Sequence, residues 1–194
     1  PDSLGNIASC SSRGPAYDGR IKPELTAYGT DGSSGAAAIT SGLAALLQQY
    51  YQQQHNGRPM DAALLRALLI NSAQDLGPEG PDYTYGYGMV DATAALQQLS
   101  SGQYLRGAVA GGNTFTHTID VPADAVNLRV TLAWMDPPAD LQATTALVHD
   151  LDLLLRTPDG QTSILPWVTS AVPNIDSLSA PAHRGIDTLN NQEI

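Results

Sequence analysis

The feature that most constrains the fold of this chain is a long apolar pattern with helical spacing that starts beside a pair of serines. The pattern begins after Ser33 and Ser34 and continues to Gln54, where the stretch at residues 55–59 stops it. It predicts one long, mostly buried helix with a hydroxyl group at its N-terminus. A helix N-terminus offers unpaired N–H groups and a positive dipole end, which favour the anion formed when a carbonyl group is attacked. Ser34 is therefore a candidate nucleophile.

Two shorter helices are predicted between this long helix and residue 100. The first starts near residue 60, has Asp61 in its first turn and ends within residues 71–75, and the second covers residues 90–99. The first 31 residues are rich in Gly, Ser and Pro, which is typical of loops with one or two short strands. Residues 1–100 are thus expected to be mostly helical.

The hydrophobic period changes from helical to alternating after residues 100–102, which predicts a domain boundary there. Residues 126–134 alternate apolar and polar positions, as do residues 115–121 and 151–155, and this pattern is typical of strands with one buried face. Residues 101–194 are therefore predicted to form an all-β sandwich. Its last stretch, residues 172–194, has little strand pattern, so we expect this unit to be truncated.

The charge balance narrows the class of partner. The chain has 19 acidic and 9 basic residues and a net charge of −10, which argues against a nucleic acid or an anionic membrane as the partner. Cys10 is the single cysteine, so an internal disulfide is excluded. No apolar run reaches the length of a membrane span. The chain starts at Pro1 without a signal-peptide pattern, so we expect a fragment whose signal peptide would lie upstream.

Several motifs follow one another in a recognisable order. In the first hundred residues they are ASCSSRGP (8–15), GRIKPELTA (19–27), the GSSGAAAITSGLAALL stretch (32–47), AALLRALLINSA (62–73) and GYGMVDA (86–92). Together they resemble the C-terminal part of the catalytic domain of subtilases, the subtilisin-like serine peptidases, which have an α/β fold. Three later motifs, LVHDLDL (147–153), PWV (166–168) and RGIDTLNN (184–191), resemble the jelly-roll β domain of alkaline subtilases.

The resemblance implies a secreted serine endopeptidase that cleaves protein or peptide substrates through an acyl-enzyme formed at Ser34, with no cofactor required for the chemistry. It aligns Ser34 with the nucleophile of the family's Gly-Thr-Ser-Met-Ala-x-Pro motif. In this chain Ser33, Gly35 and Ala38 replace the Thr, Met and Pro of that motif.

The chain is not expected to complete a catalytic triad by itself. The family's Asp, His and Asn motifs, which precede the serine, are absent. Along one continuous helix His55 would lie about 30 Å from Ser34. His117, His149 and His183 fall in the β unit, away from any nucleophile. We therefore expect the chain alone to be inactive.

The strand that delivers the serine in subtilases is also missing, because residues 26–30 run through Asp31 directly into Gly32. Catalysis requires the attacking oxygen to be placed within about 0.5 Å of its productive position, so this shortening predicts a disabled site. A degenerate, non-catalytic peptidase remnant joined to a β-sandwich that binds protein or carbohydrate is the alternative function. For Ser34 itself, the alternative is an ordinary helix N-cap. An esterase is disfavoured because the Gly-x-Ser-x-Gly spacing is absent.

The resemblance also implies that the β domain can hold calcium. Asp150 and Asp152 project from one face of a predicted strand, and Asp187 lies near the end of the chain. Carboxylates two residues apart on a strand are also typical of its solvent face. A calcium ion needs six or more oxygen ligands, of which the sequence supplies only two or three candidates.

Overall fold

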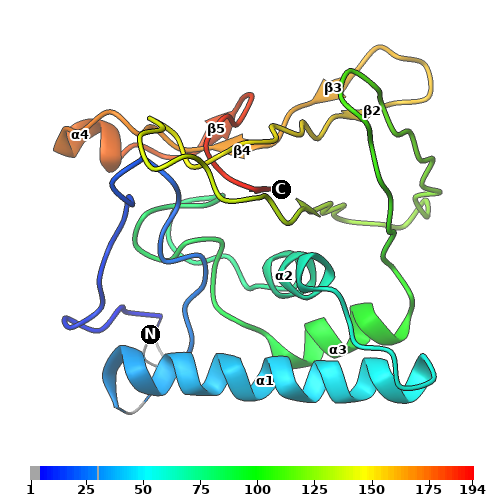
Figure 1. Cartoon of the computed structure of the whole chain (residues 1–194), viewed down its shortest axis with the longest axis horizontal. Helices are drawn as coiled ribbons and strands as arrows, with labels where there is room; N and C mark the ends of the chain where they lie inside the picture. Colours follow the sequence, from blue (N-terminus) through cyan, green and yellow to red (C-terminus); the bar gives the residue numbers. More distant parts are fainter. Residues whose placement is uncertain (1–4, 30) are drawn as a thin grey trace.

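The computed structural model describes residues 5–29 and 31–194, with helices α1 (Gly32–Gln54), α2 (Ala62–Asn71) and α3 (Ala92–Ser100) on one side of the molecule and the short strand pairs, together with helix α4 (Ile175–Leu178), on the other (Figure 1). The strands are β1 (Leu132–Ala133), β2 (Leu155–Arg156), β3 (Ser163–Ile164), β4 (Trp167–Val168), β5 (His183–Arg184) and β6 (Gln192–Glu193). In Figure 1, α2 lies between α1 and the strand pairs, and it contacts both α1 and β1.

The three predicted helices are confirmed to within a few residues. At the start of α3 the side chain of Asp91 accepts a hydrogen bond from the N–H of Ala94 at 2.9 Å, which satisfies one of the free donors of that helix end. At the end of α1 the Nδ1–H of His55 donates to the Tyr51 carbonyl at 2.8 Å, and Gly57 takes a φ of 79° in the turn that follows.

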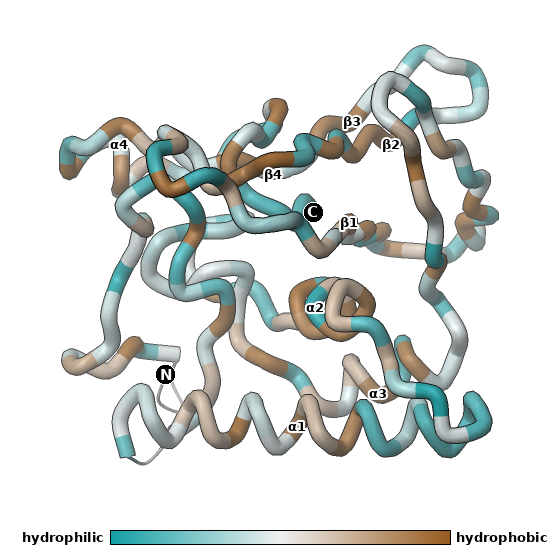
Figure 2. The backbone as a smooth tube through the Cα atoms, viewed as in Figure 1, coloured by the Kyte–Doolittle hydropathy of each residue, from teal (hydrophilic) through white to brown (hydrophobic). Residues whose placement is uncertain are grey.

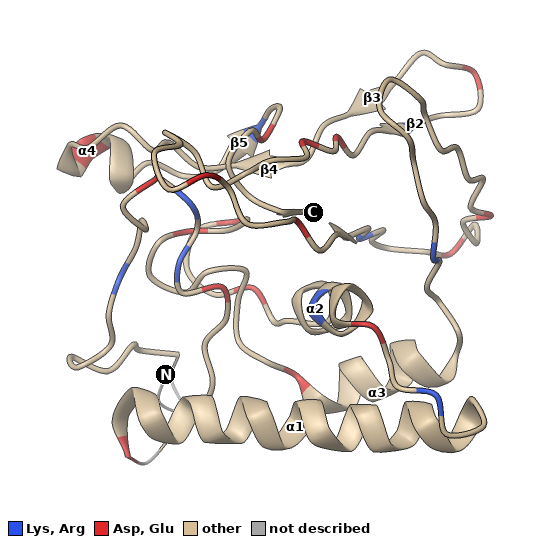
Figure 3. Ribbon diagram, viewed as in Figure 1, with Lys and Arg blue, Asp and Glu red and all other residues tan. Residues whose placement is uncertain are grey.

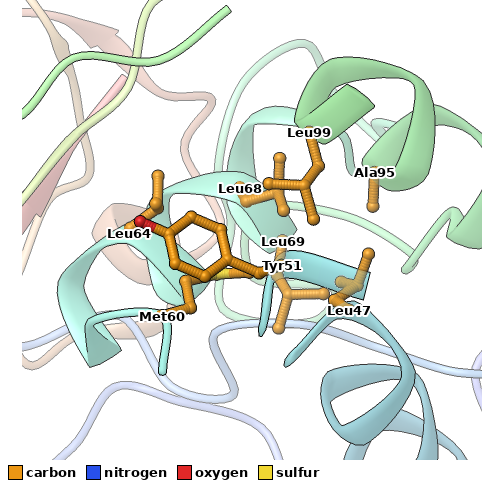
Figure 4. Packing of buried hydrophobic residues seen from close by; sticks show 8 residues of the cluster. All are labelled: Leu47, Tyr51, Met60, Leu64, Leu68, Leu69, Ala95 and Leu99. Atoms are coloured by element: carbon orange, nitrogen blue, oxygen red, sulfur yellow. The ribbon is translucent and has the colours of Figure 1, made fainter. Parts of the chain in front are cut away.

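The main hydrophobic core lies between the C-terminal half of α1 and the two helices above it (Figure 4). Figure 2 shows the apolar residues of α2 gathered in the middle of the molecule, with a hydrophilic turn after α1. Buried side chains from all three helices and from the turn between α1 and α2 form this core: Leu47, Tyr51, Met60, Leu64, Leu68, Leu69, Ala95 and Leu99.

The prediction that α1 is mostly buried is wrong. Only Leu47 and Tyr51 of this helix are buried, whereas Ile39 and Leu46 are 48% and 65% exposed. The physical reason is that α2 and α3 pack on the C-terminal half of α1 only (Figure 1). The exposed surface of α1 also carries no charged side chain, because residues 32–54 contain no Asp, Glu, Lys or Arg (Figure 3).

The second half of the chain contains strands, but no closed sandwich forms among the described residues. The antiparallel pairs β1–β6, β2–β3 and β4–β5 each stand as a separate two-stranded sheet. The predicted strand at 126–134 shortens to β1, and residues 115–121 form no strand. A strand needs a neighbouring strand that pairs with its backbone, in addition to alternating apolar and polar residues. Within residues 5–29 and 31–194, no strand pairs with residues 115–121 or with residues 126–131. Phe115, Ile119 and Val121 consequently remain about half exposed, at 57%, 45% and 50%.

The two halves of the chain nevertheless share direct contacts. The Arg129 guanidinium donates to the carbonyls of Asn71 and Ala73, at 3.2 and 2.6 Å, where α2 ends. The Tyr83 hydroxyl donates to the carbonyl of Ser170 at 3.2 Å. These bonds join the helical half to the strand-bearing half, while the domain boundary after residue 100 stays a prediction.

Candidate functional site

The segment that leads into α1 is anchored on the loop before α3. The N–H of Thr26 donates to the carbonyl of Gly88, and the N–H of Val90 donates back to the carbonyl of Thr26, both at 2.9 Å. Thr26 and Met89 thereby form an isolated parallel bridge, and Thr26 is 6% exposed. The chain thus leads toward α1 from a fixed point five residues before Asp31.

Gly29 packs directly against the first turn of α1. A Cβ at this position would lie 2.6 Å from the backbone nitrogen of Ala36 and 3.1 Å from the carbonyl oxygen of Gly32. Atoms of a side chain do not approach a backbone that closely, so only glycine fits without a shift of the segment. Sequence reasoning missed this role, although Gly29 stands in the shortened stretch at residues 26–30.

Ser34 is the third residue of α1, and its side chain is exposed. The residue before the helix is Asp31, whose carbonyl accepts the N–H of Gly35 at 3.2 Å, so the N-cap interpretation of Ser34 is wrong. No described residue accepts a hydrogen bond from the N–H groups of Ser33 or Ser34. These donors and the exposed hydroxyl lie at the positive end of the helix, where an oxyanion would be stabilised. The catalytic role of Ser34 itself stays a prediction.

Two further side chains flank this helix end. The exposed Asp31 makes no capping hydrogen bond with its carboxylate. A negative charge there favours the helix but opposes an anion bound at the same N–H groups. The Cys10 sulfur lies 3.5 Å from the position of a Cβ on Gly32, and Cys10 is exposed. The loop around residue 10 therefore borders the same surface as Ser34.

The structure brings no histidine to Ser34 among the described residues. His55 follows the opposite end of α1, about 30 Å away at 1.5 Å per residue, and its ring stacks on Tyr51 with 3.8 Å between centroids. Its Nε2 accepts a hydrogen bond from the Tyr104 hydroxyl at 3.2 Å. His149 donates from Nδ1 to Asp136 at 3.0 Å. His183 belongs to β5, and His117 lies in an exposed segment that is not a strand.

The predicted calcium ligands lie in acidic surroundings. Burial raises the pKa of Asp150, and the charges of Asp152 and Asp187 raise it further. Within residues 5–29 and 31–194, however, no three or more His, Cys, Asp or Glu side chains are grouped so that they could hold a metal ion. The residues therefore do not form a ligand set, and calcium binding stays a prediction.

Glu193 was not considered from the sequence, yet its carboxyl group is among the most deeply buried side chains. It is 1% exposed, its Oε2 accepts the N–H of Leu153, and its Oε1 has no partner. Burial raises its pKa from 4.5 to about 8, and the neighbouring charges of Asp187, Asp152 and Asp150 act in the same direction. No sequence pattern marks this residue as buried, because it lies in a polar stretch.

Comparison with known proteins points to one family. The model of the subtilase family matches residues 2–88. A serine protease/ABC transporter B family protein, tagA, of Dictyostelium discoideum is 29% identical over 208 residues, covering 79% of this chain and 12% of that protein. The subtilisin-like protease SBT6.1 of Arabidopsis thaliana is 30% identical over 121 residues, covering 52% of this chain and 12% of that protein.

A bacterial protein shows a similar but shorter match. The autotransporter lipoprotein NalP of Neisseria meningitidis serogroup B is 40% identical over 70 residues, covering 36% of this chain and 6% of that protein. The chain thus spans between 6% and 12% of the length of these curated relatives. None of the helices in residues 5–29 and 31–194 is both long and apolar enough to cross a membrane.

Proposed function

We propose that this chain, whose residues 2–88 match the model of the subtilase family, is part of a serine endopeptidase whose nucleophile is the Ser34 hydroxyl. One observation carries this proposal. The hydroxyl is exposed in the first turn of α1, beside N–H groups that no described residue uses. An attacking oxygen needs access to the substrate and nearby donors for the oxyanion, and an exposed hydroxyl at a helix N-terminus supports this role.

The chemistry proposed for Ser34 is acyl transfer in two steps. A base takes the hydroxyl proton while the oxygen bonds to the peptide carbonyl carbon, and the proton then passes to the leaving amine as the C–N bond breaks. Water afterwards hydrolyses the serine ester and restores the hydroxyl. No described histidine lies beside Ser34, so the proposed base and its aspartate belong to a polypeptide segment outside this chain. Alone, the chain is then inactive.

The rest of the chain fits this proposal as a supporting module. We propose that residues 101–194 are a jelly-roll β unit packed on the peptidase segment, which the contacts of Arg129 and Tyr83 support. Protein or peptide substrates and a site of action outside the cell are inferred from the family. The net charge of −10 disfavours nucleic acid as the partner.

A non-catalytic remnant is the second candidate, and a specific observation favours it. Only residues 27–31 separate the Thr26 bridge from α1, a shorter connection than the family resemblance implies, and Asp31 places a negative charge at the end of α1 where the oxyanion would bind. Both features would lower catalysis: the first by misplacing the attacking oxygen and the second by repelling the developing anion.

Peptide hydrolysis by the full-length gene product separates the two candidates. The Ser34→Ala variant removes the proposed nucleophile, and Ser33→Ala removes the adjacent exposed hydroxyl as a matched control. The peptidase proposal expects kcat to fall by about 10⁶-fold in Ser34→Ala and by much less in Ser33→Ala. Equal activity of Ser34→Ala and the unmodified protein would exclude Ser34 as the nucleophile, and no hydrolysis by the unmodified protein would favour the remnant.

A further inference from the structure

We propose that Asp187 and Asn190 form a metal-free latch that fastens the C-terminal half of the chain to the segment leading to Ser34. The latch consists of this pair and its bond to Ile21. It holds the chain together whether or not Ser34 catalyses a reaction.

Asp187 holds Asn190 in one orientation. Its Oδ1 accepts the N–H groups of Leu189 at 2.8 Å and of Asn190 at 3.0 Å, and its Oδ2 accepts the side-chain Nδ2–H of Asn190 at 2.8 Å. Asp187 and Asn190 are only 4% and 3% exposed. Hydrogen bonds to a buried carboxylate are stronger than those between neutral groups, so the Asn190 amide has a defined direction.

The other end of the Asn190 amide reaches the first half of the chain. Because Nδ2 faces the carboxylate, Oδ1 points away from it and accepts the N–H of Ile21 at 2.9 Å. Ile21 is fully buried and packs with Ile70, Tyr83 and Tyr87 in a second hydrophobic cluster. Without Asn190, this buried N–H would lose the acceptor that it uses, which is costly in the interior.

The latch also fixes the path of the chain toward α1. Ile21 precedes the Thr26 bridge by five residues, and Gly29 then packs on the first turn of the helix that carries Ser34. The carbonyl of Glu24 between these points accepts the N–H of Tyr87 at 2.8 Å. A side chain near the C-terminal end thus takes part in ordering the segment that presents Ser34.

This arrangement conflicts with a calcium site that uses Asp187. Both oxygens of Asp187 are engaged by three N–H donors, while calcium requires six or more oxygen ligands. The unpartnered Oε1 of Glu193 is the observation that speaks most for a cation. The described acidic side chains nevertheless do not converge on one point. The experiment must therefore separate a latch from a cation site.

A swap of the two side chains provides the sharpest test. Asp187→Asn replaces one of the two acceptor oxygens by an NH2 group, so at least one of the three N–H donors loses its partner. Asn190→Asp turns a carboxylate toward a carboxylate and removes the Nδ2–H donor. The double variant restores the pattern, because the amide introduced at position 187 can donate to the carboxylate introduced at position 190. That carboxylate can still accept the N–H of Ile21. Asp120→Asn, at an exposed aspartate, is the matched control.

The readouts are the thermal midpoint of the full chain and the hydrogen exchange of the Ile21 amide. Each single variant is expected to lower the midpoint by about 5–10 °C and the Ile21 protection by about tenfold or more. The double variant is expected to recover most of both losses, and Asp120→Asn to change neither. Saturating calcium and EDTA are expected to give the same midpoint for the unmodified chain.

Two outcomes would overturn the latch. The first is a double variant that is no more stable than the weaker single variant, because the bonding pattern would then not be what matters. The second is a clear rise of the midpoint in calcium that is lost in Asp187→Asn, because Asp187 would then be a calcium ligand. If single variants unfold the chain completely, recovery in the double variant still decides the question.

Discussion

The substitution Gly29→Ala tests whether the shortened connection really lies against the helix that carries Ser34. The added methyl would lie 2.6 Å from the Ala36 nitrogen, 3.1 Å from the Ala36 Cα and 3.1 Å from the Gly32 carbonyl oxygen. All three are backbone atoms, so no side-chain rotation can relieve the overlap. Forcing an extra carbon into such a contact costs about 1–3 kcal/mol. For a chain of this length, that corresponds to a thermal midpoint lower by about 3–10 °C.

Gly42→Ala is the matched control, because it adds the same methyl to the same helix. A Cβ on Gly42 meets nothing within 4 Å, and Gly42 lies inside α1. Replacing this glycine by alanine is expected to stabilise the chain by about 0.8–1 kcal/mol through helix propensity alone. The two variants therefore shift stability in opposite directions.

Thermal and urea unfolding measure the two stabilities, and alkylation of Cys10 reports on the site. The Cys10 sulfur lies beside Gly32, so a displaced start of α1 is expected to change the alkylation rate in Gly29→Ala and leave it unchanged in Gly42→Ala. The close packing of Gly29 on α1 is disproved if Gly29→Ala is as stable as the unmodified chain and Cys10 reacts at the same rate.

Three other substitutions test separate parts of the structure. Burial raises the pKa of Glu193 to about 8, so its stabilising contribution is complete below about pH 4.5 and is lost as pH rises toward 8. Glu193→Gln is expected to remove this part of the pH dependence in urea unfolding. Leu68→Ala, in the main core, is expected to cost about 2–5 kcal/mol in the same assay. Tyr83→Phe removes the hydroxyl oxygen that lies 3.2 Å from the carbonyl oxygens of both Gly19 and Ser170, and it is expected to cost about 1–3 kcal/mol. An unchanged stability in Leu68→Ala or in Tyr83→Phe would contradict the packing described.

The helices were predictable because their signals are local. Apolar residues at helical spacing and the stop signals around residues 55–59 define α1 wherever its partners lie. The burial of α1 was not predictable in this way, since Ile39 and Leu46 are apolar yet exposed. The spacing of apolar residues shows which face of α1 could be buried. Which part of that face is actually buried depends on where α2 and α3 pack against it.

The strands and the site depended on distant parts of the chain. The alternation of apolar and polar residues at 115–121 could not reveal that no described segment pairs with this stretch as a strand. The bond between Asn190 and Ile21 joins residues 169 positions apart, and nothing local to either residue signals it. Ser34 could be proposed from the sequence because the order of the motifs and the predicted start of the helix coincide. The close packing of Gly29 on α1 is evident only in the folded structure.

The central claim is that Ser34 presents the nucleophilic oxygen, and mapping the residue that a fluorophosphonate modifies in the full-length gene product is its most direct test. We expect one adduct, carried by Ser34, that persists in Ser33→Ala and disappears in Ser34→Ala. An adduct on another residue, or an unmodified Ser34 in a protein that hydrolyses peptides, would contradict it.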